Sequence, residues 1–378
     1  MLSTLVVLDT ERGSSTETRS GIQATNPKIY GRLNADGCSK DLAFVVIHPA
    51  NNFMNHYTLA PLHKRGAAIL GLNTRYAGNE AFLIMERCVQ DLGRGVRFLK
   101  EQGYKKVVLI GNSGGASLSC TYQSQAEKPT VRNAPDGQVV DLVASQLIPA
   151  DAIVLIAAHR GRPQIMSERI DASVTDEHDL LATDPELDIF NPKHGPPFAP
   201  EFVAKVRAAQ LARMRRIAAW CRGRLAQFEA LSTGQPVTDE AFIVHRTLAD
   251  PRYVDITLEP SGRAAQGVMG DDPAHDNYSA NGSARLSSVR SWLSQWSIDD
   301  SIADGPKRLA ETSVPVLSIN FTQDEIVFPS DVRAWRAAVG SRGEHHEIDG
   351  CGHYPMKNPP IVEKVADMVV NWARATLC

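Results

Sequence analysis

The chain has 378 residues, of which 43% are hydrophobic and 22% are charged, an ordinary globular composition with room for two or three domains. Its net charge of −3 argues against a nucleic-acid partner, because such partners bind strongly basic surfaces. The first residues lack the regions of a signal peptide, and no apolar run is long enough to span a membrane. The six cysteines are scattered without a C-x-x-C pair, so we expect a cytoplasmic protein without membrane insertion.

Apolar runs and amphipathic segments alternate over the first 161 residues. Two short edge strands are predicted at residues 2–9 and 28–33, with a polar loop between them. Continuous apolar runs then predict buried strands of a parallel sheet, because helices cover both faces of such strands. These strands are predicted at 42–47, 68–73, 106–112 and 151–158, and the helices between them at 56–67, 80–100 and 114–126. The alternation indicates an α/β fold whose mostly parallel sheet is flanked by helices.

The pattern changes after Gly161, and for about 150 residues no buried strand is predicted. A long helix is expected from Pro200 to about Leu231. An amphipathic segment is expected at 284–297, with Leu286, Val289, Leu293 and Trp296 on one side. The alternation resumes with strands at 314–320 and 344–349 and helices at 330–339 and 360–376. We therefore predict a core of residues 1–161 and 313–378, with a mainly helical cap of residues 162–312 inserted before the strand 314–320.

The central motif is Gly111-Asn112-Ser113-Gly114-Gly115, which fits the G-x-S-x-G pattern of a nucleophile elbow. Such an elbow places a serine on a sharp turn between a strand and a helix. Glycines are needed around it because a Cβ would collide with the backbone. Four apolar residues precede the motif and a helix-compatible stretch follows it, so the context fits as well as the pattern. Ser113 is therefore a candidate nucleophile.

A serine hydroxyl needs a base to remove its proton and a third group to orient that base. Candidates for both follow the last two predicted strands. Asp324 and Glu325 come after the strand 314–320, and His353 comes after the strand 344–349. The order Ser, Asp or Glu, His is the chain order of the triad that accompanies a nucleophile elbow.

With these motifs, the chain resembles the α/β-hydrolase-fold serine hydrolases over about residues 40–161 and 313–376, and it looks like a capped, esterase-like member. The resemblance implies Ser113 as nucleophile, His353 as general base and acid, and Asp324 as the orienting carboxylate, with Glu325 as the fallback. It also implies an oxyanion hole in which one donor is the backbone N–H of Gly114.

The second oxyanion donor usually follows a His-Gly pair in this family, and here the chain departs from the pattern. His48 is followed by Pro49, which has no N–H to donate. The expected donor is therefore Ala50, with Asn51 next. His48 itself is expected to be a structural loop residue.

Further residues at the carboxyl ends of the predicted strands are weaker candidates for substrate contact. They are Asn51, Arg75, Tyr76 and His159. Three tryptophans of the cap, at positions 220, 292 and 296, suggest a bulky hydrophobic substrate. Acidic stretches at 176–179 and 271–276 contain histidines but lack a metal-ligand spacing such as H-E-x-x-H, so no metal is expected.

The resemblance implies a serine hydrolase that cleaves a carboxylic ester or lactone of a small molecule through an acyl-enzyme, without a cofactor. The same triad serves amide, thioester and carbon–carbon bond hydrolysis, and the elbow does not choose among these bonds. A non-catalytic ligand-binding member of the fold is the alternative from another functional class. The sequence does not decide the oligomeric state, and a homo-oligomer is compatible with it.

Overall fold

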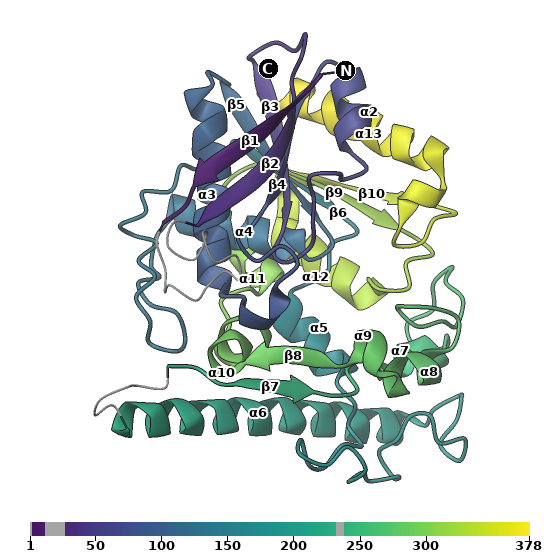
Figure 1. Cartoon of the computed structure of the whole chain (residues 1–378). Helices are drawn as coiled ribbons and strands as arrows, with labels where there is room; N and C mark the ends of the chain where they lie inside the picture. Colours follow the sequence, from purple (N-terminus) through teal and green to yellow (C-terminus); the bar gives the residue numbers. More distant parts are fainter. Residues whose placement is uncertain (1, 12–26, 232–237) are drawn as a thin grey trace.

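A computed structural model describes residues 2–11, 27–231 and 238–378. Eight strands form one sheet in the order β1-β2-β4-β3-β5-β6-β9-β10 (Figure 1). The strands are β1 (Ser3–Asp9), β2 (Lys28–Asn34), β3 (Leu42–His48), β4 (Ala68–Asn73), β5 (Lys106–Asn112), β6 (Ala152–Ile156), β9 (Val316–Phe321) and β10 (Gly343–Ile348). The predicted loop between the first two strands lies largely outside the described residues.

The sheet is parallel from β4 to β10, whereas β1 and β2 pair antiparallel with their neighbours. Every residue of β3, β4, β6 and β9 is buried, as the continuous apolar runs predict for strands covered on both faces. The predicted mostly parallel α/β sheet is confirmed. Its carboxyl edge therefore gathers the loops that follow β3, β5, β6, β9 and β10.

Helices cover both faces of the sheet, and alternate residues of β3, such as Phe44 and Val45, belong to different apolar cores. One face packs against α3 (Met85–Glu101), α4 (Gly115–Glu127), α11 (Gly305–Ala310) and α12 (Pro329–Val339), and the other against α2 (Leu59–Lys64) and α13 (Pro359–Leu377). Short 3₁₀ turns are η1 (Glu80–Phe82), η3 (Gly340–Arg342) and η4 (Pro355–Lys357).

The predicted helix 80–100 is divided, which corrects the sequence-based boundary. The turn η1 ends at Phe82, Leu83 and Ile84 are extended, and α3 begins only at Met85. The apolar stripe continues across this break because Leu83 and Ile84 are also buried, so periodicity alone did not reveal it. The break matters because it leaves Glu80 off the helix.

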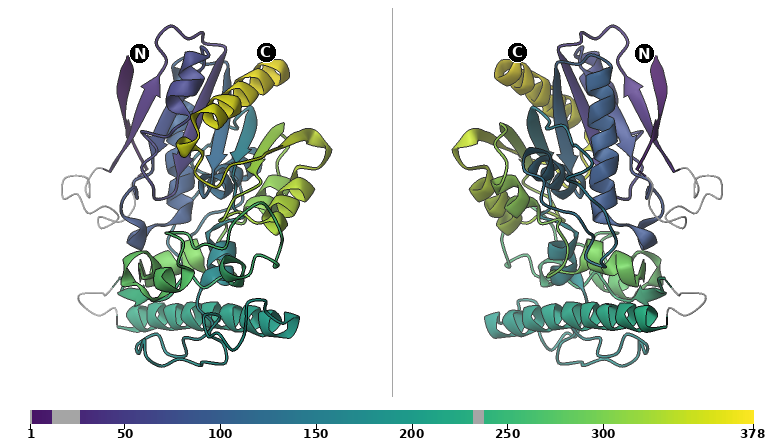
Figure 2. Two further views of the ribbon diagram at one scale, coloured as in Figure 1. Left: turned by 90° about the vertical axis from the view of Figure 1, so that its right-hand side faces the viewer. Right: turned by 90° about the vertical axis from the view of Figure 1, so that its left-hand side faces the viewer.

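Most of the segment between β6 and β9 forms a second layer over the carboxyl edge of the sheet (Figure 1). It contains α5 (Arg162–Arg169), α6 (Pro200–Ala230), β7 (Ala241–Val244), α7 (Pro251–Val254), α8 (Pro273–Tyr278), α9 (Ala280–Ser283), β8 (Arg285–Ser288), α10 (Val289–Ser291) and the π-helical turn η2 (Trp292–Trp296). Figure 2 shows the long helix α6 on the side of this layer that faces away from the sheet. Apolar cores of its own hold the layer together.

The expected mainly helical character of this layer is confirmed, with one short exception: β7 and β8 pair as a small antiparallel sheet. One expectation needs correction. The segment 284–297 does not have one continuous apolar side: Leu286 lies on β8 and is 44% exposed, whereas Leu293 and Trp296 lie on η2 and are buried. β8 is too short for its alternation to be distinguished from helical spacing.

The carboxyl-terminal end of the predicted cap also packs differently from the rest of that segment. Helix α11 contacts α4 and α12, and Leu309 on it belongs to the core of the sheet. These contacts associate α11 with the core, although the sequence-based division assigns it to residues 162–312.

All six cysteines lie in the described ranges and are free thiols. Within those ranges no helix has both the length and the apolar character needed to cross a bilayer.

Candidate active site

Ser113 lies at the sharp turn between β5 and α4, with φ of 52° in the left-handed region. Its neighbours have no room for a side chain. A Cβ on Gly111 would lie 2.5 Å from the Cα of Ala116, and one on Gly115 would lie 2.2 Å from the carbonyl oxygen of Ile47. The glycines of the motif are therefore required by the close approach of the backbone, as in a strained nucleophile elbow.

A continuous chain of hydrogen bonds joins three of the predicted residues. The His353 Nε2 atom lies 2.9 Å from the Ser113 Oγ atom, and Nδ1 of the same ring lies 2.9 Å from Oδ2 of Asp324. Oδ1 of Asp324 accepts the backbone N–H groups of Ile326 and Val327, each at 2.8 Å. Because a carboxylate accepts at Nδ1, that nitrogen carries the proton and the lone pair of Nε2 faces the serine hydroxyl.

Of the two candidate acids, Asp324 reaches the imidazole ring. Glu325 contributes differently: its Oε2 accepts the backbone N–H of His353 at 3.1 Å. Both carboxylates thus act on the loop that carries His353, but only Asp324 is hydrogen-bonded to a ring nitrogen among the described contacts.

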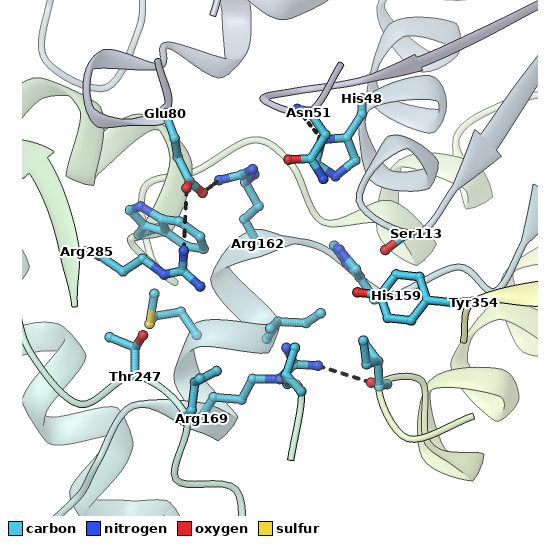
Figure 3. Close-up of a pocket in the computed structure, with 16 residues that line it drawn as sticks. His48, Asn51, Glu80, Ser113, His159, Arg162, Arg169, Thr247, Arg285 and Tyr354 are labelled. Carbon is cyan, nitrogen blue, oxygen red and sulfur yellow. Dashed lines mark hydrogen bonds and ion pairs between the residues drawn. The ribbon is translucent and has the colours of Figure 1, made fainter. Parts of the chain in front are cut away.

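A cavity of about 230 Å³ opens beside Ser113 (Figure 3). The carboxyl ends of the strands and the loops that follow them supply His48, Asn51, Ser113 and His159. The second layer supplies Arg162, Arg169, Thr247 and Arg285. The candidate nucleophile therefore lies in the wall of a small, polar cavity between the two layers. No group of three or more metal-ligating side chains is found in the part of the chain that the structure describes.

Neither a protein-family model nor a curated protein matches the sequence. Solved structures do match its fold. They include DcsB in complex with its substrate analogue (12% identity, TM-score 0.53, covering 99% of each chain). The α/β hydrolase GrgF from Penicillium sp. sh18 is 12% identical with a TM-score of 0.51, covering 100% of this chain and 99% of that one. The hypothetical protein PA2218 from Pseudomonas aeruginosa is 12% identical with a TM-score of 0.51, covering 97% and 94%.

The chain has the α/β-hydrolase fold. In that fold the oxyanion donors lie next to the nucleophile. The predicted donors differ here in whether their N–H groups already make a hydrogen bond. The Gly114 N–H makes no hydrogen bond within the described residues, so it is available. The N–H groups of Ala50 and Asn51 instead both donate to Nδ1 of His48, at 3.2 and 2.9 Å. The ring of His48 thus engages both of the backbone donors that the sequence suggests.

His48 consequently has a defined tautomer. Since Nδ1 accepts two hydrogen bonds, the proton of the neutral ring is on Nε2. Burial, and after it the charge of Arg162, lowers the pKa of His48 to about 3, so the ring is neutral at physiological pH. The sequence alone gave His48 only a structural role in its loop.

Two histidine rings lie close to the Cα atom of Gly114. A Cβ built on Gly114 would lie 2.7 Å from Nε2 of His48 and 3.0 Å from Nε2 of His159. Burial, and next the charge of Arg169, lowers the pKa of His159 well below its usual value. The sequence-based proposal of His159 as a residue near the substrate agrees with this position, and Asn51 also lines the cavity.

Arg75 and Tyr76, which the sequence suggested as substrate contacts, do not line the cavity. Arg75 is turned away toward α3, where its Nη2 donates to Oδ1 of Asp91 at 2.7 Å and both side chains are fully buried. Tyr76 is also fully buried. Asp91 is one of several charged residues that α3 buries, with Glu86 and Arg87, so no distinct sequence signal indicates this pairing.

The tryptophans give little support to the expected bulky hydrophobic substrate. Trp220 and Trp292 pack within the second layer's own core, and only Trp296 lines the cavity, where the Arg162 guanidinium lies 4.8 Å from its ring centroid. The arginines of the cavity wall were missed because they come from separate parts of the inserted segment. No local spacing in the sequence connects them.

Proposed function

We propose that this protein is a serine hydrolase that cleaves a carboxylic ester or lactone through an acyl-enzyme intermediate. The observation that carries the proposal is the hydrogen-bond chain from Ser113 through His353 to Asp324, with both links at 2.9 Å. It lies at a strained elbow in the wall of a cavity, where a substrate carbonyl can approach the serine. This arrangement has the geometry of nucleophile, base and orienting acid.

The reaction follows from this geometry. Ser113 Oγ attacks the carbonyl carbon while His353 Nε2 takes its proton, and the Asp324 carboxylate stabilises the imidazolium that forms. His353 then returns the proton to the leaving alcohol oxygen, which leaves an ester between Ser113 and the acyl group. A water molecule, deprotonated by His353, attacks this ester and releases the acid. The proton returns to Ser113 at the end of the cycle.

For the oxyanion we propose a pair of donors that includes a side chain. The first is the free N–H of Gly114, and the second is the Nε2–H of His48, which lies beside Gly114. The N–H groups of Ala50 and Asn51 already donate to Nδ1 of His48. The Nε2–H of the same ring therefore takes their place as the second oxyanion donor. Because the pKa of His48 is about 3, the ring stays neutral, with its proton on Nε2, over the physiological pH range.

The test compares purified wild-type and Ser113→Ala proteins on a panel of p-nitrophenyl and methyl esters. We expect the variant to lose a factor on the order of 10⁴–10⁶ in kcat. Ser167→Ala is a matched control on α5 and should keep the wild-type rate. A fluorophosphonate probe should label the wild type stoichiometrically at Ser113. Folded wild-type protein that is neither labelled nor active on any ester would favour the ligand-binding alternative.

A further inference from the structure

Three arginines of the second layer line the cavity that contains Ser113. Arg162 and Arg169 come from the two ends of α5, and Arg285 begins β8 (Figure 3). Among the described residues that line the cavity, Glu80 is the one carboxylate. The wall therefore contains three positive charges against one negative charge.

Glu80 is shared between two of these arginines. It forms an ion pair with Nη1 of Arg162, and its Oε2 lies 3.6 Å from Nη1 of Arg285. Burial raises the pKa of Glu80, but the charges of the two guanidinium groups lower it by more. The pKa therefore lies below its usual value, and Glu80 is ionised. Its single charge balances only one of the two arginines.

Arg169 has no acidic partner among the residues that the structure describes. Its Nη2 donates to the carbonyl oxygen of Ile326 at 3.2 Å, and its guanidinium lies 5.6 Å from the ring centroid of Tyr253. Neither contact supplies negative charge. Arg169 is nevertheless buried, with 9% of its surface exposed.

A buried arginine cannot relieve this imbalance by losing its proton, because its pKa is too high. A buried charge without a counter-ion is costly, so excess charge in a cavity wall is accounted for by what the cavity binds. Donor capacity is also unused, since the Nε atoms of Arg162 and Arg285 are buried without a hydrogen-bond partner in the described structure. Guanidinium groups bind carboxylates and phosphates with paired, charge-assisted hydrogen bonds.

We propose that the substrate is a small ester or lactone that carries a carboxylate or phosphate group, and that Arg169 binds this group. The inference rests on the proposed hydrolase function and names its substrate class. A cavity of about 230 Å³ is below the roughly 300–1,000 Å³ usual for drug-sized ligands, which selects a compact substrate. Arg162 and Arg285 add positive potential around the same group.

The first experiment compares charged esters with an uncharged isostere in a pH-stat. Monomethyl glutarate is the carboxylate probe, methyl 3-(phosphonooxy)propanoate is the phosphate probe, and methyl 4-carbamoylbutanoate replaces the carboxylate by a neutral amide. We expect kcat/KM for at least one charged ester to exceed that of the amide by about 100-fold, as for one charge-assisted pair. The more active probe distinguishes carboxylate from phosphate. Equal values for all three esters would overturn the proposal.

The second experiment locates the binding group. Arg169→Met should raise KM for the preferred charged ester at least tenfold and leave hydrolysis of the amide isostere within threefold. Arg169→Lys keeps the charge and should retain part of the preference. Arg215→Met is the control, because Arg215 is an exposed arginine that pairs with Asp299 on the outer surface. Equal losses on charged and neutral esters in Arg169→Met would reduce Arg169 to a structural residue and contradict the proposal.

A binding measurement covers the case in which the Arg169 variants do not fold. Calorimetry on Ser113→Ala protein should show tighter binding of glutarate or of 3-phosphonooxypropanoate than of glutaramide, and equal affinities would count against an anion site. Failure of this inference is distinguishable from failure of the hydrolase proposal. Fluorophosphonate labelling of Ser113 with hydrolysis indifferent to substrate charge rejects the inference alone. An unlabelled, inactive wild type rejects both.

Discussion

Asp324 meets the His353 ring with both carboxylate oxygens, at 2.9 and 3.1 Å from Nδ1, whereas the adjacent Glu325 reaches only the backbone of His353. Asp324→Asn should therefore lower kcat by about 10⁴-fold, because an amide no longer fixes the tautomer that leaves Nε2 free. Glu325→Gln keeps an acceptor for the His353 N–H and should keep most of the activity. Steady-state ester hydrolysis measures both. The reverse ranking would make Glu325 the acid.

His48 provides a test of the proposed oxyanion hole. His48→Phe keeps a planar ring against Gly114 but removes the Nε2–H donor, so kcat should fall about 10²–10³-fold with little change in KM. The Nδ1 acceptor is lost as well, so His48→Asn serves as the second variant, since its side-chain amide restores a donor and an acceptor. An unchanged kcat in folded His48→Phe would return the donor role to the backbone of Ala50 or Asn51.

Two glycine substitutions should have opposite effects on stability. Gly115→Ala puts a Cβ 2.2 Å from the carbonyl oxygen of Ile47, a backbone atom that cannot move away, and should destabilise the fold by about 3 kcal/mol. Gly223→Ala is the control: Gly223 lies inside α6 with open space around it, so alanine should stabilise by about 0.5–1 kcal/mol. Urea unfolding measures both free energies. A neutral Gly115→Ala would contradict the close packing at the elbow.

The buried carboxyl of Glu86 should make the protein less stable as the pH rises. Burial raises the pKa of Glu86 to about 7, although the Ser294 hydroxyl donates to its Oε2 at 2.7 Å. A carboxyl with a raised folded-state pKa contributes stability below its unfolded pKa of about 4.5, and this contribution is lost as the pH rises through about 7. The free energy of unfolding of Glu86→Gln should therefore increase, relative to that of wild type, by on the order of 2 kcal/mol as the pH rises from 5 to 8.5.

The Glu86 measurement uses urea unfolding of both proteins at the two pH values. Because the comparison is between proteins that differ at one residue, the other titrating groups cancel. Buried histidines such as His56, whose pKa burial lowers to about 4, change the stability of both proteins equally. A difference between wild type and Glu86→Gln that stays constant with pH would show that Glu86 titrates normally.

Several features followed from the sequence because they rest on local constraints. Buried parallel strands must be apolar on both faces, so β3 and β5 are visible as continuous runs. The glycines around Ser113 are dictated by backbone contacts at one turn. Since the loops after parallel strands meet at one edge of the sheet, the predicted order of strands also predicted that Asp324 and His353 would come close to the serine.

The tertiary structure alone decided the contacts between side chains far apart in the chain. Arg75 pairs with Asp91 and so does not line the cavity. The His48 ring accepts a hydrogen bond from the N–H of Ala50 in the adjoining loop. The positive wall arises because Arg169 and Arg285 reach one cavity from different elements. Long-range electrostatic and hydrogen-bond partners leave no periodic signal in a sequence. Hence the sequence by itself determined the strands and the candidate triad, whereas the structure decided which donors and charges lie at the cavity.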